Sequence, residues 1–270
     1  MGSEVFRKSS EIPHAQRFIS VQYLKSIPTS VSTNANTPFS LQAISLLVKL
    51  SGVSHYLVHS LVAERLNSTS WQDRVKACVI IPKLDGGLTK DIANKLSTMM
   101  WRDWHKTVRK VAAQTLGKTG NGKLVHNVLL GKLEAEKETT RIEAVAMMGH
   151  LGILTAQLLP RFVNLLNDEY VNVRKQACVT ARDLRSSNQI VIENLLRLAT
   201  FDPDWEVKAQ AIKSLGSLAD KTEEIKKCLL WAMRYEDKPG VRAQACNSLV
   251  SLRYYEDDVK QIIQDRYLVS

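Results

Sequence analysis

Residues that could bind a metal or perform nucleophilic chemistry are few in this sequence of 270 residues. Among its six histidines, His55 and His59 stand four positions apart and would share one face of a helix, where two side chains can coordinate the same metal ion. No further cysteine, histidine or carboxylate stands at a spacing that would complete such a site. We therefore expect an ordinary helix face here and no bound metal.

The cysteines and glycines do not indicate catalysis either. Cys78, Cys178 and Cys246 each follow an alanine, and a shared position of this kind is what packing inside a repeated unit produces. No serine or cysteine is arranged with histidine in a nucleophilic pattern, and Gly86-Gly87 is not followed by the Gly-Lys-Ser/Thr of a phosphate loop. The sequence thus favours a protein that is not an enzyme and needs no cofactor.

A cation recurs at a nearly constant interval through most of the chain. The six cations are separated by 35, 32, 33, 34 and 34 residues, and each is followed three positions later by alanine. They are Arg74, Arg109, Arg141, Arg174, Lys208 and Arg242. An interval of this length is typical of proteins built from stacked repeats.

Each cation begins an amphipathic segment. Apolar residues follow it at offsets of about 3, 4, 7 and 10, as in Ala144, Val145, Met148 and Leu151, which is the spacing of one helical face. The recurring alanine allows two helices to approach closely. Glycines at one shared position (Gly117, Gly149 and Gly216) are predicted to terminate these helices.

Another apolar helix is expected before each of these segments, so the cation-bearing helix is the second helix of each pair. The expected ranges are 55–66, 90–101, 123–134, 156–167, 190–200 and 223–235, with a terminal half-unit at 257–268. Each unit is therefore a helix–turn–helix of about 33 residues, and such a pair must stack on its neighbours to bury its apolar face.

The run Asp103…Val108-Arg109…Ala112…Leu116-Gly117 resembles HEAT repeats, in the shorter variety shared with lyase-like HEAT proteins. The resemblance implies an all-α fold, a right-handed α-solenoid (an armadillo-like superhelix) of about six HEAT-like helix pairs. We expect this solenoid to span residues 41–270. A flexible N-terminal arm is expected at residues 1–40, where the stretch 24–40 is rich in Ser, Thr, Asn and Pro.

The resemblance also implies a ladder of ion pairs between neighbouring repeats, formed by an aspartate and the cation six residues later. The residues concerned are Asp103, Arg109, Asp168, Arg174, Asp202 and Lys208. No aspartate stands six residues before Arg74, Arg141 or Arg242, so the ladder stays open at those places, although Glu236 can substitute before Arg242. No histidine is followed by glutamate, which argues against the iron-dependent hydroxylases of this fold.

The candidate binding surface is the polar side of the second, cation-bearing helices, opposite the apolar side that faces the core. Second helices line the concave surface in this fold class, and solenoids bind partners there. The partner-binding residues predicted on this side are Lys76, Lys83, Gln114, Lys118, Glu143, His150, Gln176, Asp183, Gln210, Lys213 and Gln244. A merely solvated face is the alternative.

Charge is distributed unevenly along the chain, whose formal net charge is +10. Residues 71–120 carry ten Lys and Arg against four Asp and Glu, whereas residues 201–270 carry eleven against twelve. The basic end favours a protein partner, namely an acidic or extended peptide, bound in a salt-sensitive way. Nucleic-acid binding through the basic repeats is an alternative, disfavoured because the surplus is confined to one end. A lyase-like or chaperone role is a third.

Tryptophans gather at the expected turns: Trp71, Trp101, Trp104 and Trp205. They are predicted to seal adjacent repeats, with an exposed aromatic row for a partner as the alternative. No apolar run of membrane-spanning length and no secretory leader stands out, so we expect an intracellular, cytoplasmic protein with reduced thiols and no membrane contact. The sequence does not predict an oligomeric state.

Overall fold

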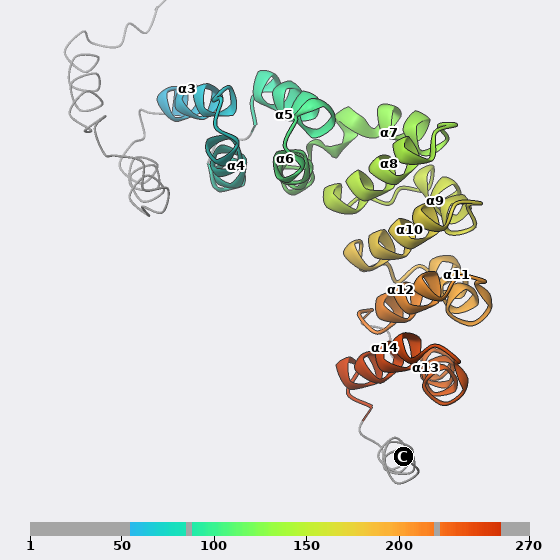
Figure 1. Cartoon of the computed structure of the whole chain (residues 1–270). Helices are drawn as coiled ribbons and strands as arrows, with labels where there is room; N and C mark the ends of the chain where they lie inside the picture. Colours follow the sequence, from blue (N-terminus) through green and yellow to red (C-terminus); the bar gives the residue numbers. More distant parts are fainter. Residues whose placement is uncertain (1–54, 85–87, 219–221, 255–270) are drawn as a thin grey trace, which may run out of the picture. The chain divides into compact units, whose positions relative to one another are not determined.

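The computed structural model describes residues 55–84, 88–218 and 222–254, all of which belong to the unit Leu50–Ser270. These residues form twelve α-helices and two short 3-10 helices (Figure 1). No helix among them combines the length and apolar character that crossing a membrane requires. The predicted arm at 1–40 and half-unit at 257–268 lie outside the described residues.

The twelve helices form six consecutive pairs, each a repeat made of a first and a second helix (Figure 1). Repeats 1 to 3 are α3 (His55–Leu66) with α4 (Trp71–Ile80), α5 (Lys90–Arg102) with α6 (Lys106–Lys118), and α7 (His126–Leu133) with α8 (Glu138–Leu151). Repeats 4 to 6 are α9 (Leu158–Leu166) with α10 (Val171–Asp183), α11 (Gln189–Phe201) with α12 (Trp205–Leu215), and α13 (Glu223–Tyr235) with α14 (Pro239–Ser251). The short helices η1 (Ile81–Lys83) and η2 (Asn121–Val125) follow α4 and precede α7.

The first helices lie close to the predicted ranges, and polar caps explain where several helices start. The side chains of Thr89, Asn188 and Thr222 accept backbone N–H bonds at the starts of α5, α11 and α13. In repeat 3 the expected helix 123–134 is divided, because its first turn is the 3-10 helix η2, which follows Gly120 in a left-handed conformation with φ 72°.

The core lies between the first and second helices of each pair and continues from repeat to repeat. Successive second helices pack against one another, from α4 through α14, and the first helices α7, α9, α11 and α13 do so as well. The alanine three positions after each cation is buried in every repeat: Ala77, Ala112, Ala144, Ala177, Ala211 and Ala245. The predicted all-helical solenoid of six helix pairs is thus confirmed.

The prediction that the shared glycines end these helices was wrong for Gly117 and Gly149, whereas Gly216 does cap the end of α12. Gly117 and Gly149 lie inside α6 and α8, and Gly216 follows α12 with φ −66°, so none of them ends a helix in the left-handed conformation. Instead they lie where successive second helices approach closely. A Cβ on Gly117 would stand 2.0 Å from the carbonyl oxygen of Leu151 in the next repeat, and one on Gly216 would stand 2.4 Å from Ser248 Cβ.

Hydroxyl groups form a second link between successive second helices, which the sequence analysis missed. The hydroxyl six positions after the cation donates to a carbonyl oxygen of the preceding second helix, over 2.7–3.1 Å. The bonds are Thr115 to Cys78, Thr180 to Val145, Ser214 to Cys178 and Ser248 to Ile212. Because a carbonyl oxygen has a second lone pair, each bond links two helices without breaking either.

Adding one methyl group at Gly117 tests the close approach of α6 and α8. We expect Gly117→Ala to lower the free energy of unfolding by about 2 kcal/mol, since the two backbones must separate. The matched control is Gly131→Ala in α7, where a Cβ would meet nothing within 4 Å and should stabilise by about 0.5–1 kcal/mol. Urea unfolding followed by circular dichroism measures both; a stabilised Gly117→Ala would contradict the packing described.

Candidate functional site

An ion-pair ladder runs along the turns between first and second helices. Each arginine of the ladder binds an aspartate of the following repeat with two parallel bonds: Nε to one carboxylate oxygen at 2.8 Å, and Nη2 to the other at 2.8–3.0 Å. The pairs are Arg74–Asp103, Arg141–Asp168 and Arg174–Asp202, and Lys208 Nζ continues the series with Glu236 at 2.7 Å. The side chains are largely buried; those of Arg74 and Asp103 are 7% and 6% exposed.

Each ladder group is also tied to its own turn. Arg174 Nη1 donates to the carbonyl oxygens of Asp168 and Glu169, and Asp202 Oδ1 accepts the Asp204 N–H at 2.9 Å. These bonds compensate for removing the charges from water. The hydrogen bond to Asp202 raises the pKa of the Arg174 guanidinium further above its usual value.

The structure places the expected ladder residues in this network but pairs them across repeats. Asp103 and Arg109 do not pair through their side chains; Arg109 Nη1 donates to the Asp103 carbonyl oxygen at 2.9 Å. In the four ladder pairs the carboxylate comes 27 to 29 residues after its cation. For this reason Arg74 and Arg141, where the sequence left the ladder open, both have a partner.

We call the contact between two successive repeats a joint. The joint between repeats 2 and 3 has neither a ladder ion pair nor a hydroxyl bond between its second helices. The carboxylate that Arg109 would meet is replaced by Ala135, six residues before Arg141, and the hydroxyl position is taken by Met147. Arg109 Nε lies 3.4 Å from Glu143 Oε1 of α8, without a hydrogen bond. Among the successive joints of the described repeats 2 to 6, this one therefore has neither a ladder pair nor a hydroxyl bond.

The predicted partner-binding residues lie on the second helices, apart from Lys83 in η1, and none of them is buried. We call this set the second-helix face: Lys76, Lys83, Gln114, Lys118, Glu143, His150, Gln176, Asp183, Gln210, Lys213 and Gln244. They come from all six repeats, so the face crosses every second helix.

Charges of neighbouring second helices interact on this face. Burial is the main cause that lowers the pKa of His150, nearby Lys110 adds to it, and Asp183 acts in the opposite direction. Lys175 of α10 also pairs with Glu206 of α12.

Three glutamines occupy one repeat position on the second-helix face. Gln176, Gln210 and Gln244 each stand two residues after the cation of repeats 4, 5 and 6. Gln210 Nε2 is buried and has no hydrogen-bond partner in the described structure. An amide offers both a donor and an acceptor, which are the groups that recognise a peptide backbone.

The tryptophans bridge neighbouring repeats. Trp71 stacks on His105 with ring centroids 3.9 Å apart, Lys132 lies 4.8 Å from the Trp101 ring, and Arg74 lies 5.6 Å from the Trp104 ring. Trp205 lies beside Gly240 of the next repeat. Trp104 nevertheless stays 69% exposed.

The cysteines are poor nucleophiles. Burial raises the pKa of Cys78 and of Cys178 to about 12, so both thiols stay protonated at physiological pH. Among the described residues no group of histidine, cysteine and carboxylate side chains could hold a metal ion. The side chains of His55 and His59, and the Gly86-Gly87 pair, lie outside the described part.

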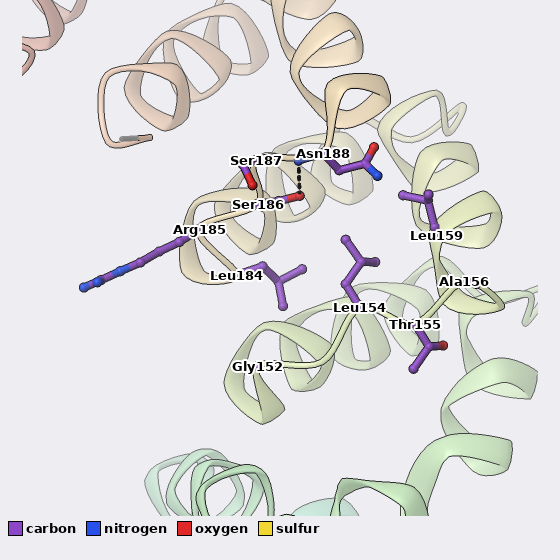
Figure 2. A pocket seen from close by; sticks show the side chains of 10 residues that line it. All are labelled: Gly152, Leu154, Thr155, Ala156, Leu159, Leu184, Arg185, Ser186, Ser187 and Asn188. Carbon is purple, nitrogen blue, oxygen red and sulfur yellow. Dashed lines mark hydrogen bonds between the residues drawn. The ribbon is translucent and has the colours of Figure 1, made fainter. Parts of the chain in front are cut away.

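One open hollow of about 530 Å³ lies between the loops that follow α8 and α10 (Figure 2). Leu154, Leu159 and Leu184 point into it, while Arg185 points away (Figure 2). Its polar groups are hydroxyls and one amide, and no histidine, cysteine or carboxylate lines it. A hydroxyl without a neighbouring base is not activated as a nucleophile, and no residue of the second-helix face contributes to the hollow.

Comparison with known proteins supports the repeat type. Residues 192–269 match the family model described as HEAT repeats. Among solved structures, the Escherichia coli protein YibA is similar with 16% identity, 97% of each chain covered and a TM-score of 0.43. A designed armadillo repeat protein in complex with the peptide (KR)4 has 18% identity, with 72% of this chain and 98% of that chain covered, and a TM-score of 0.37.

A lyase structure is similar at a comparable level. The complex of CpcE and CpcF of phycocyanin lyase from Nostoc has 15% identity, with 76% of this chain and 92% of that chain covered, and a TM-score of 0.34. Because the identities and TM-scores are this low, none of these structures carries an argument about function.

Removing one ladder carboxylate tests its contribution. Asp202 is 5% exposed, so Asp202→Ala leaves the Arg174 guanidinium buried without its partner and should cost about 3–5 kcal/mol of stability. The control is Asp237→Ala, which removes an exposed carboxylate from the next turn and should change stability by less than about 0.5 kcal/mol. Urea unfolding compares the two, and equal effects would contradict a structural role for the ladder.

Proposed function

We propose that this protein, a solenoid of HEAT-type repeats, is a non-catalytic scaffold that binds a partner protein along its second-helix face. One observation carries the proposal: the face places polar side chains, none of them buried as a whole, on every second helix and outside the hydrophobic core. The ladder charges and hydroxyls face neighbouring repeats, whereas these eleven side chains do not form the core.

The charge along the face supports an acidic partner segment at its N-terminal end. Lys76, Lys83 and Lys118 lie there, and the described network pairs only Lys76, at 4.0 Å from Asp73. Charges of this kind accelerate association and select partners more than they tighten binding. We therefore expect an affinity that falls as salt rises.

The C-terminal half of the face supports an extended peptide. Packed helices lie roughly 8–10 Å apart, and an extended chain advances roughly 3.3 Å per residue. A peptide crossing the second helices would therefore pass one repeat about every three residues. Gln176, Gln210 and Gln244 stand at one position of three successive repeats and would present their side-chain amides to its backbone.

Charge reversal tests the face. In a pull-down from cells with quantitative mass spectrometry, Lys76→Glu, Lys83→Glu and Lys118→Glu combined should reduce the recovery of specific partners by about tenfold. That factor corresponds to about 1.4 kcal/mol, as expected for a few partly exposed charges. The same variants are then titrated with an identified partner in low and high salt.

The matched control reverses three exposed lysines elsewhere: Lys90→Glu, Lys123→Glu and Lys227→Glu. Partner recovery should be unchanged, because this control has the same net charge as the first triple variant while its second-helix face is intact. Equal losses in both triple variants, or none in the first, would overturn the assignment to the face. Binding to random-sequence DNA that collapses with salt would instead favour the nucleic-acid alternative.

A further inference from the structure

The joint between repeats 2 and 3 contains an arginine at the ladder position that does not hold a ladder carboxylate. At Arg74, Arg141 and Arg174 the Nε and Nη2 groups together hold an aspartate. Arg109 Nη1 donates to the Asp103 carbonyl oxygen, which is one of the two turn carbonyl positions that Nη1 binds at the other three arginines. Ala135 supplies no carboxylate at the ladder position, so the described carboxylate contact of Arg109 is the ion pair with Glu143, at 3.4 Å from Nε and without a hydrogen bond.

This joint has hydrogen-bond donors without acceptors. Arg109 Nε is buried and makes no hydrogen bond, and Trp101 Nε1 of the same repeat is also buried and unbonded. In the other ladder turns the aspartate also accepts the N–H two residues later, as Asp168 does from Tyr170. The equivalent N–H here is that of Lys137, and the Ala135 methyl group accepts nothing.

Nearby carboxylates of the chain do not fill the position. Glu143 stays 3.4 Å from Arg109 Nε, and its own side chain is 34% exposed. Glu134 pairs with Arg161 at 2.7 Å, and Glu136 has no ion pair with Arg109 among the described contacts. Exposed lysines also stand at this joint, namely Lys106, Lys110 and Lys137.

We propose that this joint is a binding site for a carboxylate, supplied by an aspartate or glutamate side chain of an acidic segment of a partner protein. The arginine fork matches a carboxylate with two parallel bonds. The same chain builds this site three times with an aspartate in place, and those three pairs serve as the template for the ligand. The proposal shares with the scaffold function the class of ligand and one residue of the second-helix face, Glu143, which contacts Arg109; it does not depend on Lys76, Lys83 or Lys118.

The proposal is tested by a substitution that places a carboxylate of the chain itself at the ladder position. The full chain is titrated with a fluorescein-labelled oligoglutamate peptide, and binding is followed by anisotropy. Ala135→Asp should restore the missing ladder pair, raise the urea midpoint and weaken peptide binding by about tenfold, although Arg109 remains. The control Thr139→Asp adds the same charge at an exposed position of α8 and should weaken binding less than twofold.

The outcomes separate this site from the second-helix face. Binding unchanged in Ala135→Asp, or weakened equally in Ala135→Asp and Thr139→Asp, overturns the carboxylate site, and so does an absence of peptide binding by the wild type. If the Lys76, Lys83 and Lys118 reversal alone abolishes binding, the face stands and this site fails. If Ala135→Asp alone weakens it, the site stands without the face.

Discussion

The close approach of successive second helices is the constraint on which the rest of the structure depends. It requires positions without bulk, and the sequence supplies three kinds: alanine three residues after the cation, a hydroxyl six residues after it and, in some repeats, glycine eight residues after it. Gly216 faces Ser248 and Gly149 faces Thr180, so small residues of one helix meet small residues of the next. Such contacts give dense packing without a large hydrophobic side chain at the crossing.

The ladder serves the same constraint at the turns. A buried arginine–aspartate pair contributes little net stability by itself, because removing two charges from water costs nearly as much as their attraction returns. What it contributes is alignment: Arg174 meets Asp202 only when the two helix pairs stack in one relative position, and sliding by one residue would leave both charges unpaired. The hydroxyl bond from Ser214 to the Cys178 carbonyl oxygen fixes the same joint at a second point.

Features that depend on spacing along the chain could be predicted from the sequence, whereas contacts between stacked repeats could not. The recurring cation and its alanine indicate the period, the helix pairs and the buried face, because these follow from spacing along one chain. The pairing of Arg74 with Asp103 could not be derived in this way, since it depends on how one repeat lies on the next. The role of Gly117 was misinterpreted for the same reason. Its position near a helix end is typical of a cap, and its contact with the Leu151 backbone depends on how the two repeats stack. Thr115 and Ser214 share a repeat position, which was the signal for the hydroxyl bonds.

The division of charged residues between framework and surface explains why the two candidate sites differ in kind. Four of the six repeat cations complete a described ladder pair, and Arg242 holds two carbonyl oxygens of its own turn. The lysines of the second-helix face lie outside that framework, so their loss should change binding and not folding. Arg109 has the repeat position of the framework but no ladder carboxylate, and this difference is the basis for proposing that it binds a ligand. A repeat that departs from the pattern at one residue, Ala135, can thereby acquire a binding group whose geometry the neighbouring repeats already define.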